Sequence, residues 1–208
     1  MNDHDAGDAE DASPDTTGEW YTERLGHHSD RSWKRLIPDP YRWHLRRMGL
    51  GRVLDVGCGI GRCLAFLDGN GVGIDHNPTS VEFCRRRGLE AYTPSEFDQL
   101  SPGLFDSLLL SHVLEHTSPE ESQHLLSQYL PFVRTGGKLV LITPQPSGQR
   151  SDPTHVRYLD RDALRQQLQI LGATEIRTRS FPFPAVVGRV FRFNENVAIG
   201  HHRGAVGS

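Results

Sequence analysis

The segment VLDVGCGIGRCL, residues 53–64, constrains the fold more than any other part of the chain. A short apolar strand leads to an acidic residue, Asp55, and three glycines then alternate with other residues before a helical pattern begins. Glycine is needed where the backbone takes a positive φ angle or where a ligand approaches the main chain closely. Open α/β sheets bind nucleosides at such a turn after the first strand. The segment therefore predicts a parallel sheet with a ligand-binding loop that contains Gly57, Gly59 and Gly61.

The rest of the chain alternates between short apolar segments and helical patterns. Strands are expected over residues 52–56, 71–74, 89–92, 105–110, 138–143, 174–179 and 189–198, and helices over 40–48, 61–67, 78–87, 118–133 and 160–171. This alternation predicts an α/β fold, a Rossmann-like doubly wound sheet that is mostly parallel and has helices on both faces. The last two strands leave no room for a helix between them, so we expect them to form an antiparallel hairpin at one edge.

The two ends of the chain differ in composition from its centre. Residues 1–18 are acidic and rich in small residues, which is typical of a disordered tail. Residues 19–49 are aromatic and basic and form a predicted cap, either a lid in which Trp20 and Tyr21 move or a segment whose aromatic side chains pack on outer helices. The remaining expected parts are one ligand-binding domain over residues 50–200 and a flexible tail over residues 201–208.

The glycine loop departs from the dinucleotide fingerprint G-x-G-x-x-G. Arg62 occupies the position of the third glycine, and the spacing is G-x-G-x-G instead. The shifted spacing indicates a ligand that has no pyrophosphate to be seated at the start of the helix. Asp75, at the end of the second strand, is placed to accept hydrogen bonds from both hydroxyls of a ribose. The pattern as a whole favours a single nucleoside over a dinucleotide.

Four segments, the first of them within the glycine segment, carry a family resemblance: VLDVGCGIG, GVGIDHNPTSVEFCRRRG, FDSLLLSHVLEH and PFVRTGGKLVLITP. In this order and spacing they resemble the class I S-adenosylmethionine-dependent methyltransferases, over roughly residues 50–180. The HVLEH segment is similar to the subgroup of ubiquinone-pathway O-methyltransferases and many bacterial small-molecule methyltransferases. The resemblance implies S-adenosyl-L-methionine as the cofactor, bound by the methyltransferase domain over residues 50–200.

The resemblance also implies a role for each matching position. Asp55 and the loop backbone would hold the methionine half of the cofactor, and Asp75 would bind its ribose. His76 would lie beside the adenine, with Glu96 or its neighbours near the adenine amino group. The segment DPYRWHLRRM is similar to a subgroup helix whose arginine, here Arg42, would pair with the methionine carboxylate. The implied cofactor-binding residues are Arg42, Asp55, Gly57, Cys58, Gly59, Gly61, Asp75, His76, Glu96 and Ser111.

Three histidines are candidates for the catalytic chemistry. Methyl transfer is an in-line displacement, and an oxygen nucleophile often needs a general base, for which an imidazole is suited near neutral pH. The candidates are His112, His116 and His155. Each also has a structural interpretation: His112 as a packing or cofactor contact, His116 as a group that orients the next helix, and His155 as a hydrogen-bonding group that fixes its loop.

His112 and His116 are four residues apart, a spacing that places two zinc ligands on one face of a helix. However, Ser118 and Glu121 form a predicted capping box, so the helix should begin only after both histidines. The chain also contains no CxxC pair. We therefore expect a loop at the end of a strand and no metal site.

The sequence thus predicts an enzyme that methylates a small organic acceptor at oxygen without a metal. Outside the acidic first residues the chain is only mildly basic, which does not favour nucleic acid. No apolar run is long enough for a membrane span, and the three cysteines fit reduced thiols in the cytoplasm. The sequence makes no prediction about the oligomeric state.

Two alternatives keep a similar fold. One is a non-catalytic protein that binds the cofactor and acts as a regulator or scaffold. The other is an NAD-type oxidoreductase, which Arg62 and the HVLEH segment disfavour.

Overall fold

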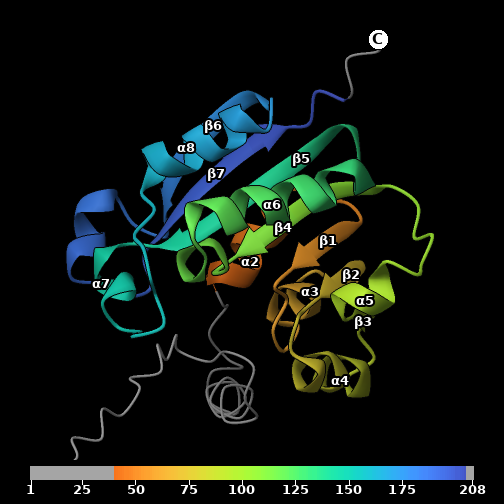
Figure 1. Cartoon of the computed structure of the whole chain (residues 1–208). Helices are drawn as coiled ribbons and strands as arrows, with labels where there is room; N and C mark the ends of the chain where they lie inside the picture. Colours follow the sequence, from red (N-terminus) through yellow and green to blue (C-terminus); the bar gives the residue numbers. More distant parts are fainter. Residues whose placement is uncertain (1–39, 205–208) are drawn as a thin grey trace, which may run out of the picture.

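The protein is described by a computed structural model over residues 40–204, and its centre is a seven-stranded sheet in the order β3-β2-β1-β4-β5-β7-β6 (Figure 1). The strands are β1 Val53–Val56, β2 Gly71–Ile74, β3 Ala91–Tyr92, β4 Phe105–Ser111, β5 Val133–Pro144, β6 Thr174–Phe181 and β7 Glu195–His201. The α-helices are α2 Pro40–Arg47, α3 Arg62–Phe66, α4 Pro78–Arg86, α5 Pro94–Phe97, α6 Pro119–Tyr129, α7 Pro146–Gln149 and α8 Arg161–Ile170. The short 3-10 helices are η2 Leu114–His116, η3 Leu130–Phe132 and η4 Ala185–Arg189.

The sheet has the predicted doubly wound arrangement. Strands β1 to β5 pair with one another in parallel, whereas β7 is antiparallel to both β5 and β6. The predicted antiparallel pair therefore lies at one edge of a mostly parallel sheet, as expected. Within this pair β7 adjoins β5, and β6 is the outermost strand.

Burial explains the order of the two last strands. Val197 and Ala198 in β7 are fully buried, whereas residues along β6 alternate between partly buried and exposed. A strand that is apolar on both faces is stable inside a sheet, and a half-exposed strand can form its edge. The prediction of a strand over residues 189–198 is wrong at its start, because Arg189 ends η4 and β7 begins only at Glu195.

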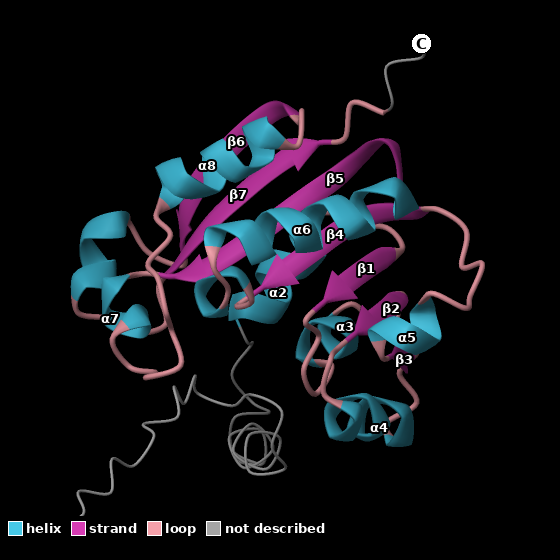
Figure 2. Cartoon of the chain, viewed as in Figure 1, coloured by secondary structure: helices cyan, strands magenta, loops and turns pink. Residues whose placement is uncertain are grey.

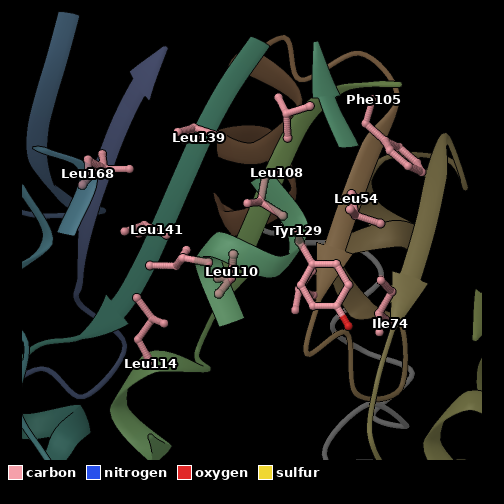
Figure 3. Close-up of a cluster of buried hydrophobic side chains, with 14 of the residues drawn as sticks. Leu54, Ile74, Phe105, Leu108, Leu110, Leu114, Tyr129, Leu139, Leu141 and Leu168 are labelled. Carbon is pink, nitrogen blue, oxygen red and sulfur yellow. The ribbon is translucent and has the colours of Figure 1, made fainter. Parts of the chain in front are cut away.

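Helices cover both faces of the sheet, and two apolar cores lie between the layers (Figure 2). Successive side chains of a strand point to opposite faces, so neighbours in β4 belong to different cores. Leu108 and Leu110 pack with Tyr129 of α6 and Leu168 of α8 (Figure 3). Leu109 instead packs with the buried faces of α2, α3 and α4. The sheet therefore packs against helices on both faces.

The helices begin at the predicted signals. Asn77 Oδ1 accepts a hydrogen bond of 3.0 Å from the backbone N–H of Thr79 at the start of α4. Ser118 and Glu121 form the reciprocal capping box at the start of α6. Helix α6 ends at Tyr129, earlier than predicted, because Pro131 has no N–H with which to continue the hydrogen-bond pattern.

Some expectations fall outside the described residues. The predicted acidic tail and most of the predicted cap, with Trp20 and Tyr21, lie in the range 1–39. At the other end, β7 extends to His201, and the backbone N–H of His202 donates to Gly137 O at 2.8 Å. The described fold therefore continues past the predicted start of the C-terminal tail. Within residues 40–204, no helix has the length and apolar character of a membrane span.

The strand order creates a switch point between β1 and β4. The chain proceeds from β1 outward through β2 and β3, and then continues on the other side with β4 and β5. Ligands of open α/β sheets bind at the carboxyl ends of the strands beside such a point. Because β7 is antiparallel, its first residue, Glu195, pairs with Pro144 at the carboxyl end of β5. The glycine loop, the segment after β4 and Glu195 therefore lie at the same edge of the sheet.

Replacing Ser118 by alanine is expected to lower the free energy of unfolding by about 1 kcal/mol, because an N-cap side chain contributes roughly 0.5–2 kcal/mol. Ser127→Ala is the matched control, since Ser127 is exposed within the same helix and alanine has the higher helix propensity. Urea unfolding followed by circular dichroism measures both changes. Equal stability of the two variants contradicts the role of the cap.

Candidate functional site

The glycine loop, residues 57–61, leaves the carboxyl end of β1 and closes against β2. Its three glycines have φ angles of +73°, +51° and +74°, a region that side chains with a Cβ rarely adopt. The backbone N–H groups of Gly57 and Cys58 donate to the carbonyl oxygen of Ile74, at 2.7 and 3.0 Å. The shape of the loop therefore depends on the alternating glycines.

Asp75 follows β2 and accepts two backbone hydrogen bonds. Its Oδ2 accepts from the N–H of Gly59 at 2.7 Å, and its Oδ1 accepts from the N–H of Asn77 at 2.9 Å. A carboxylate has about four lone-pair sites, so capacity remains for the hydroxyls of a ribose. His76 is next to it, with a side chain that is 55% exposed. Asp75 thus ties the glycine loop to β2 at the place where a nucleoside is predicted.

Asp55 is a buried acid within β1, beside the loop. The residue is 1% exposed, and its Oδ2 has no hydrogen-bond partner among the described residues. Burial, together with the negative charge of Asp75, raises the pKa of this carboxyl to about 7. Buried carboxylate oxygens normally have a partner, and a cationic group of a ligand would supply one. The ammonium group of S-adenosylmethionine is such a cation, so the residues present fit the predicted cofactor.

Two of the predicted cofactor contacts have other partners. The guanidinium of Arg42, on α2, is 3.6 Å from the carboxylate of Asp68. Glu96 Oε2 accepts from the N–H of Thr93 at 2.7 Å and pairs with Arg85 at 2.9 Å. These contacts place Arg42 beside the end of α3 and make Glu96 part of the cap of α5.

Ser111 ends β4 and contacts a residue that the sequence analysis did not assign to the site. The hydroxyl of Tyr41 lies 2.6 Å from Ser111 Oγ, and Tyr41 is 8% exposed. Burial is the main cause that raises the pKa of Tyr41 well above its usual value, so the phenol stays protonated. Its inward orientation follows a visible signal, because Tyr41, Leu45 and Met48 share one apolar face of the helix expected over 40–48.

His112 connects two carboxylates. Its φ angle is +60°, which is uncommon for a residue other than glycine. Its Nδ1 lies 3.2 Å from Glu115 Oε1, and its Nε2 lies 2.8 Å from Glu195 Oε1. The surrounding protein lowers the pKa of His112 by desolvation, although 41% of its side chain is exposed, and the hydrogen bonds and charges of both carboxylates outweigh this effect and raise the pKa to about 10. An imidazolium cannot accept a proton, so the structure favours a positioning role for His112 over that of a general base.

Glu195 is a second site residue that the sequence analysis missed. It is 8% exposed, and its Oε2 has no partner among the described residues. Its location depends on the antiparallel pairing of β7 with β5, which no local pattern indicates. In the sequence it lies inside the strand expected over residues 189–198.

His116 and His155 lie side by side, with ring centroids 4.8 Å apart. His116 ends η2, so it does not share an α-helix with His112, as expected. Burial lowers the pKa of His116. Together with Glu115 the two histidines form a compact group, in which one side-chain N or O atom of each residue lies within 4.8 Å of the others. Of the three catalytic candidates, His112 is therefore held by two carboxylates, whereas His116 and His155 form a neighbouring pair.

A family model matches most of the chain. This model, described as "Methyltransferase domain", covers residues 25–177. The match includes the glycine loop, Asp75 and the three histidines. No curated protein matches the chain.

Several solved structures are similar in fold. A SAM-dependent methyltransferase from Archaeoglobus fulgidus has a TM-score of 0.62 at 21% identity, covering 81% of this chain and 96% of that chain. A TehB-like SAM-dependent methyltransferase from Corynebacterium glutamicum has a TM-score of 0.60 at 16% identity, with 89% and 100% covered. The N-methyltransferase NodS from Bradyrhizobium japonicum, in complex with S-adenosyl-l-homocysteine, has a TM-score of 0.60 at 16% identity, with 87% and 97% covered. At these identities the likeness concerns the fold alone.

The carboxyl of Asp55 is expected to make stability depend on pH. In the folded protein the Asp55 carboxyl keeps its proton up to about pH 7, whereas in the unfolded chain it loses the proton near pH 4. The contribution of Asp55 to stability therefore falls as the pH rises between these values. Asp55→Asn removes this titration, and the variant should gain stability relative to the unchanged protein as pH rises from 4 to 7. Each unit of pKa difference corresponds to about 1.4 kcal/mol, so the gain is on the order of a few kcal/mol. Urea unfolding of both proteins at several pH values measures it, and parallel stability curves would contradict the unpartnered carboxyl.

Proposed function

The chain belongs to the methyltransferase-domain family, with S-adenosyl-L-methionine as its cofactor, and on that premise we propose that it methylates a small organic acceptor at oxygen. The observation that carries the proposal is that two groups of polar residues lie together at the carboxyl ends of the parallel strands. A buried, unpartnered acid lies beside the glycine loop, and a cluster of histidines follows β4.

On the cofactor side, the proposed roles follow the polar groups at the ends of β1, β2 and β4. Asp75 accepts hydrogen bonds from the ribose, Asp55 binds the ammonium group, and Ser111 lies near the sulfonium. S-adenosylmethionine supplies an activated methyl group, so an in-line attack by the acceptor is sufficient for transfer. The remaining task of the protein is to align the acceptor oxygen with the methyl group and to exclude water.

On the acceptor side, the pair formed by His116 and His155 is proposed to face the acceptor. In each ring Nδ1 lies within 3.1 Å of a backbone carbonyl oxygen, which can only accept a hydrogen bond. In the neutral form, each ring would therefore have its lone pair at Nε2. His112 holds Glu115 and Glu195 in place, since each of its ring nitrogens contacts one of the two carboxylates. A hydroxyl acceptor has to lose its proton, and a lone pair on an imidazole nitrogen can accept it. The arrangement of the two rings therefore supports oxygen as the acceptor atom.

The same proposal places the enzyme in the cytoplasm and among small-molecule enzymes. All three cysteines are buried free thiols, which fits a reducing compartment. The chain has a formal net charge of −3, which gives no support for nucleic acid as the acceptor.

Isothermal titration calorimetry with S-adenosylhomocysteine tests the cofactor assignments. Asp75→Ala is expected to weaken binding at least about tenfold, because a hydrogen bond to a charged group contributes about 1.5–3 kcal/mol. Glu82→Ala is the control, since Glu82 is an exposed acid on α4. The affinity of this variant for S-adenosylhomocysteine should not change. Normal binding by a folded Asp75→Ala variant would contradict the ribose assignment.

Turnover on a panel of small hydroxyl, amine and thiol acceptors tests the reaction itself. We expect transfer of the methyl group of S-adenosylmethionine to hydroxyl compounds, detected by mass spectrometry. Transfer only to amines would contradict the proposed oxygen acceptor. Tight cofactor binding with no turnover on any acceptor would instead favour the regulatory or scaffold alternative.

A further inference from the structure

We propose that Glu115, His116 and His155 form a binding site for a divalent transition metal with the ligand preferences of zinc. The expectation of no metal site rested on the capping box at Ser118, which keeps His112 and His116 off a shared helix, and on the absence of a CxxC pair. The structure pairs His116 with a different histidine, His155, which comes from the loop between α7 and α8. The site consists of two imidazoles and one carboxylate, with the three candidate ligand atoms within 4.8 Å of one another.

The hydrogen bonds of both histidines leave the same nitrogen available. His116 Nδ1 is 3.1 Å from the carbonyl oxygen of Thr154, and His155 Nδ1 is 2.9 Å from the carbonyl oxygen of Gln149. The hydroxyl of Thr154, also 3.1 Å from His116 Nδ1, donates its hydrogen to Asp152 and so serves His116 as an acceptor. Both rings therefore carry their hydrogen on Nδ1 and have a lone pair on Nε2. Histidines that bind metals are usually fixed in this way by a hydrogen bond from the other ring nitrogen.

The carboxylate provides a second, independent indication of a ligand. Glu115 is 0% exposed, and its Oε2 is buried with no hydrogen-bond partner among residues 40–204. Its other oxygen already interacts with His112 at 3.2 Å. A buried carboxylate oxygen without a partner is costly unless a cation or a donor satisfies it. A metal ion between Glu115 and the two rings would do so.

The backbone holds the three residues together before any ion binds. Val156 and Arg157 donate backbone hydrogen bonds of 2.9 and 3.3 Å to the carbonyl oxygen of Glu115, which pins the loop of His155 onto η2. Nitrogen and oxygen ligands bind zinc at about 2.0–2.2 Å, so neighbouring ligand atoms around the ion lie roughly 3–3.5 Å apart. The three atoms lie within 4.8 Å of one another, so side-chain rotations would have to bring them closer to reach that spacing.

The ligand set indicates both the metal and its use. Magnesium and calcium prefer oxygen ligands, whereas an imidazole pair with one carboxylate suits zinc or iron(II). Three protein ligands leave a coordination position open, as in catalytic rather than structural sites. With both Nε2 lone pairs bound to the ion, a metal here would lower the pKa of an acceptor hydroxyl in place of direct proton transfer to His116 or His155, a role that rests on the proposed function. Metal binding itself does not depend on that function.

Calorimetric titration of chelator-treated protein with zinc chloride tests the site, with cobalt(II) absorption as a second readout of coordination by nitrogen. We expect one ion per chain. His155→Ala and Glu115→Gln should each weaken binding by roughly 100-fold or more, since loss of a group that merely orients a ligand already costs about 10–100-fold. His124→Ala is the matched control, because His124 is an exposed histidine on α6, and it should bind as the unchanged protein does.

The affinity for S-adenosylhomocysteine, measured on the same samples, should be equal in all four proteins and shows that the variants are folded. No zinc binding by the unchanged protein, or equal zinc affinity of the folded His155→Ala variant, overturns the metal site. Zinc binding that depends on His155, together with no methylation of hydroxyl compounds, keeps the metal site and contradicts the oxygen acceptor instead.

Discussion

The structure of the site depends on two acids, Asp55 and Asp75. Asp55 lies in β1, and Asp75 directly follows the neighbouring parallel strand β2. Asp75 binds the backbone of the glycine loop at Gly59, and hydrogen bonds to a charged group contribute about 1.5–3 kcal/mol each. This contact fixes the loop against β2, and the charge of Asp75 acts on the nearby carboxyl of Asp55. Asp55 itself is left buried without a partner for one oxygen, which destabilises the protein when no cation is bound. Local features that oppose stability are expected at binding sites, where a ligand supplies the missing interaction.

A second group of charges organises the acceptor side. His112 joins Glu115 of η2 to Glu195 of β7, so it connects the segment after β4 to the antiparallel strand. Glu115 in turn adjoins His116 and His155. One imidazole is therefore held as a cation by two carboxylates, while the neighbouring pair keeps nitrogen lone pairs. The separation of these two states follows from the partners of each ring: carboxylates for His112 and backbone carbonyls for the other two.

The sequence predicts the parts of this structure that depend on local patterns. Strand β2 occupies the predicted residues 71–74, and the glycine loop and the capping box at Ser118 occur where expected. The start of β7 could not be predicted in this way, because Val190 and Phe193 resemble strand residues but are 82% and 63% exposed.

Local sequence patterns also do not predict contacts between distant segments. Glu195 joins the site only because β7 pairs with β5 in antiparallel register. His155 reaches His116 only because its loop folds back onto η2 through a backbone hydrogen bond to Glu115. Arg42 pairs with Asp68 in this structure, and its predicted contact with the methionine carboxylate stays a prediction.

The central claim is that the edge between β1, β2 and β4 binds S-adenosylmethionine with its charged groups matched to the two acids. A crystal structure of the complex with S-adenosylhomocysteine tests it most directly. The account predicts the ribose hydroxyls on Asp75 and the ammonium group within hydrogen-bond distance of Asp55 Oδ2. A ligand bound elsewhere, or bound here with Asp55 Oδ2 still unpartnered, would contradict it.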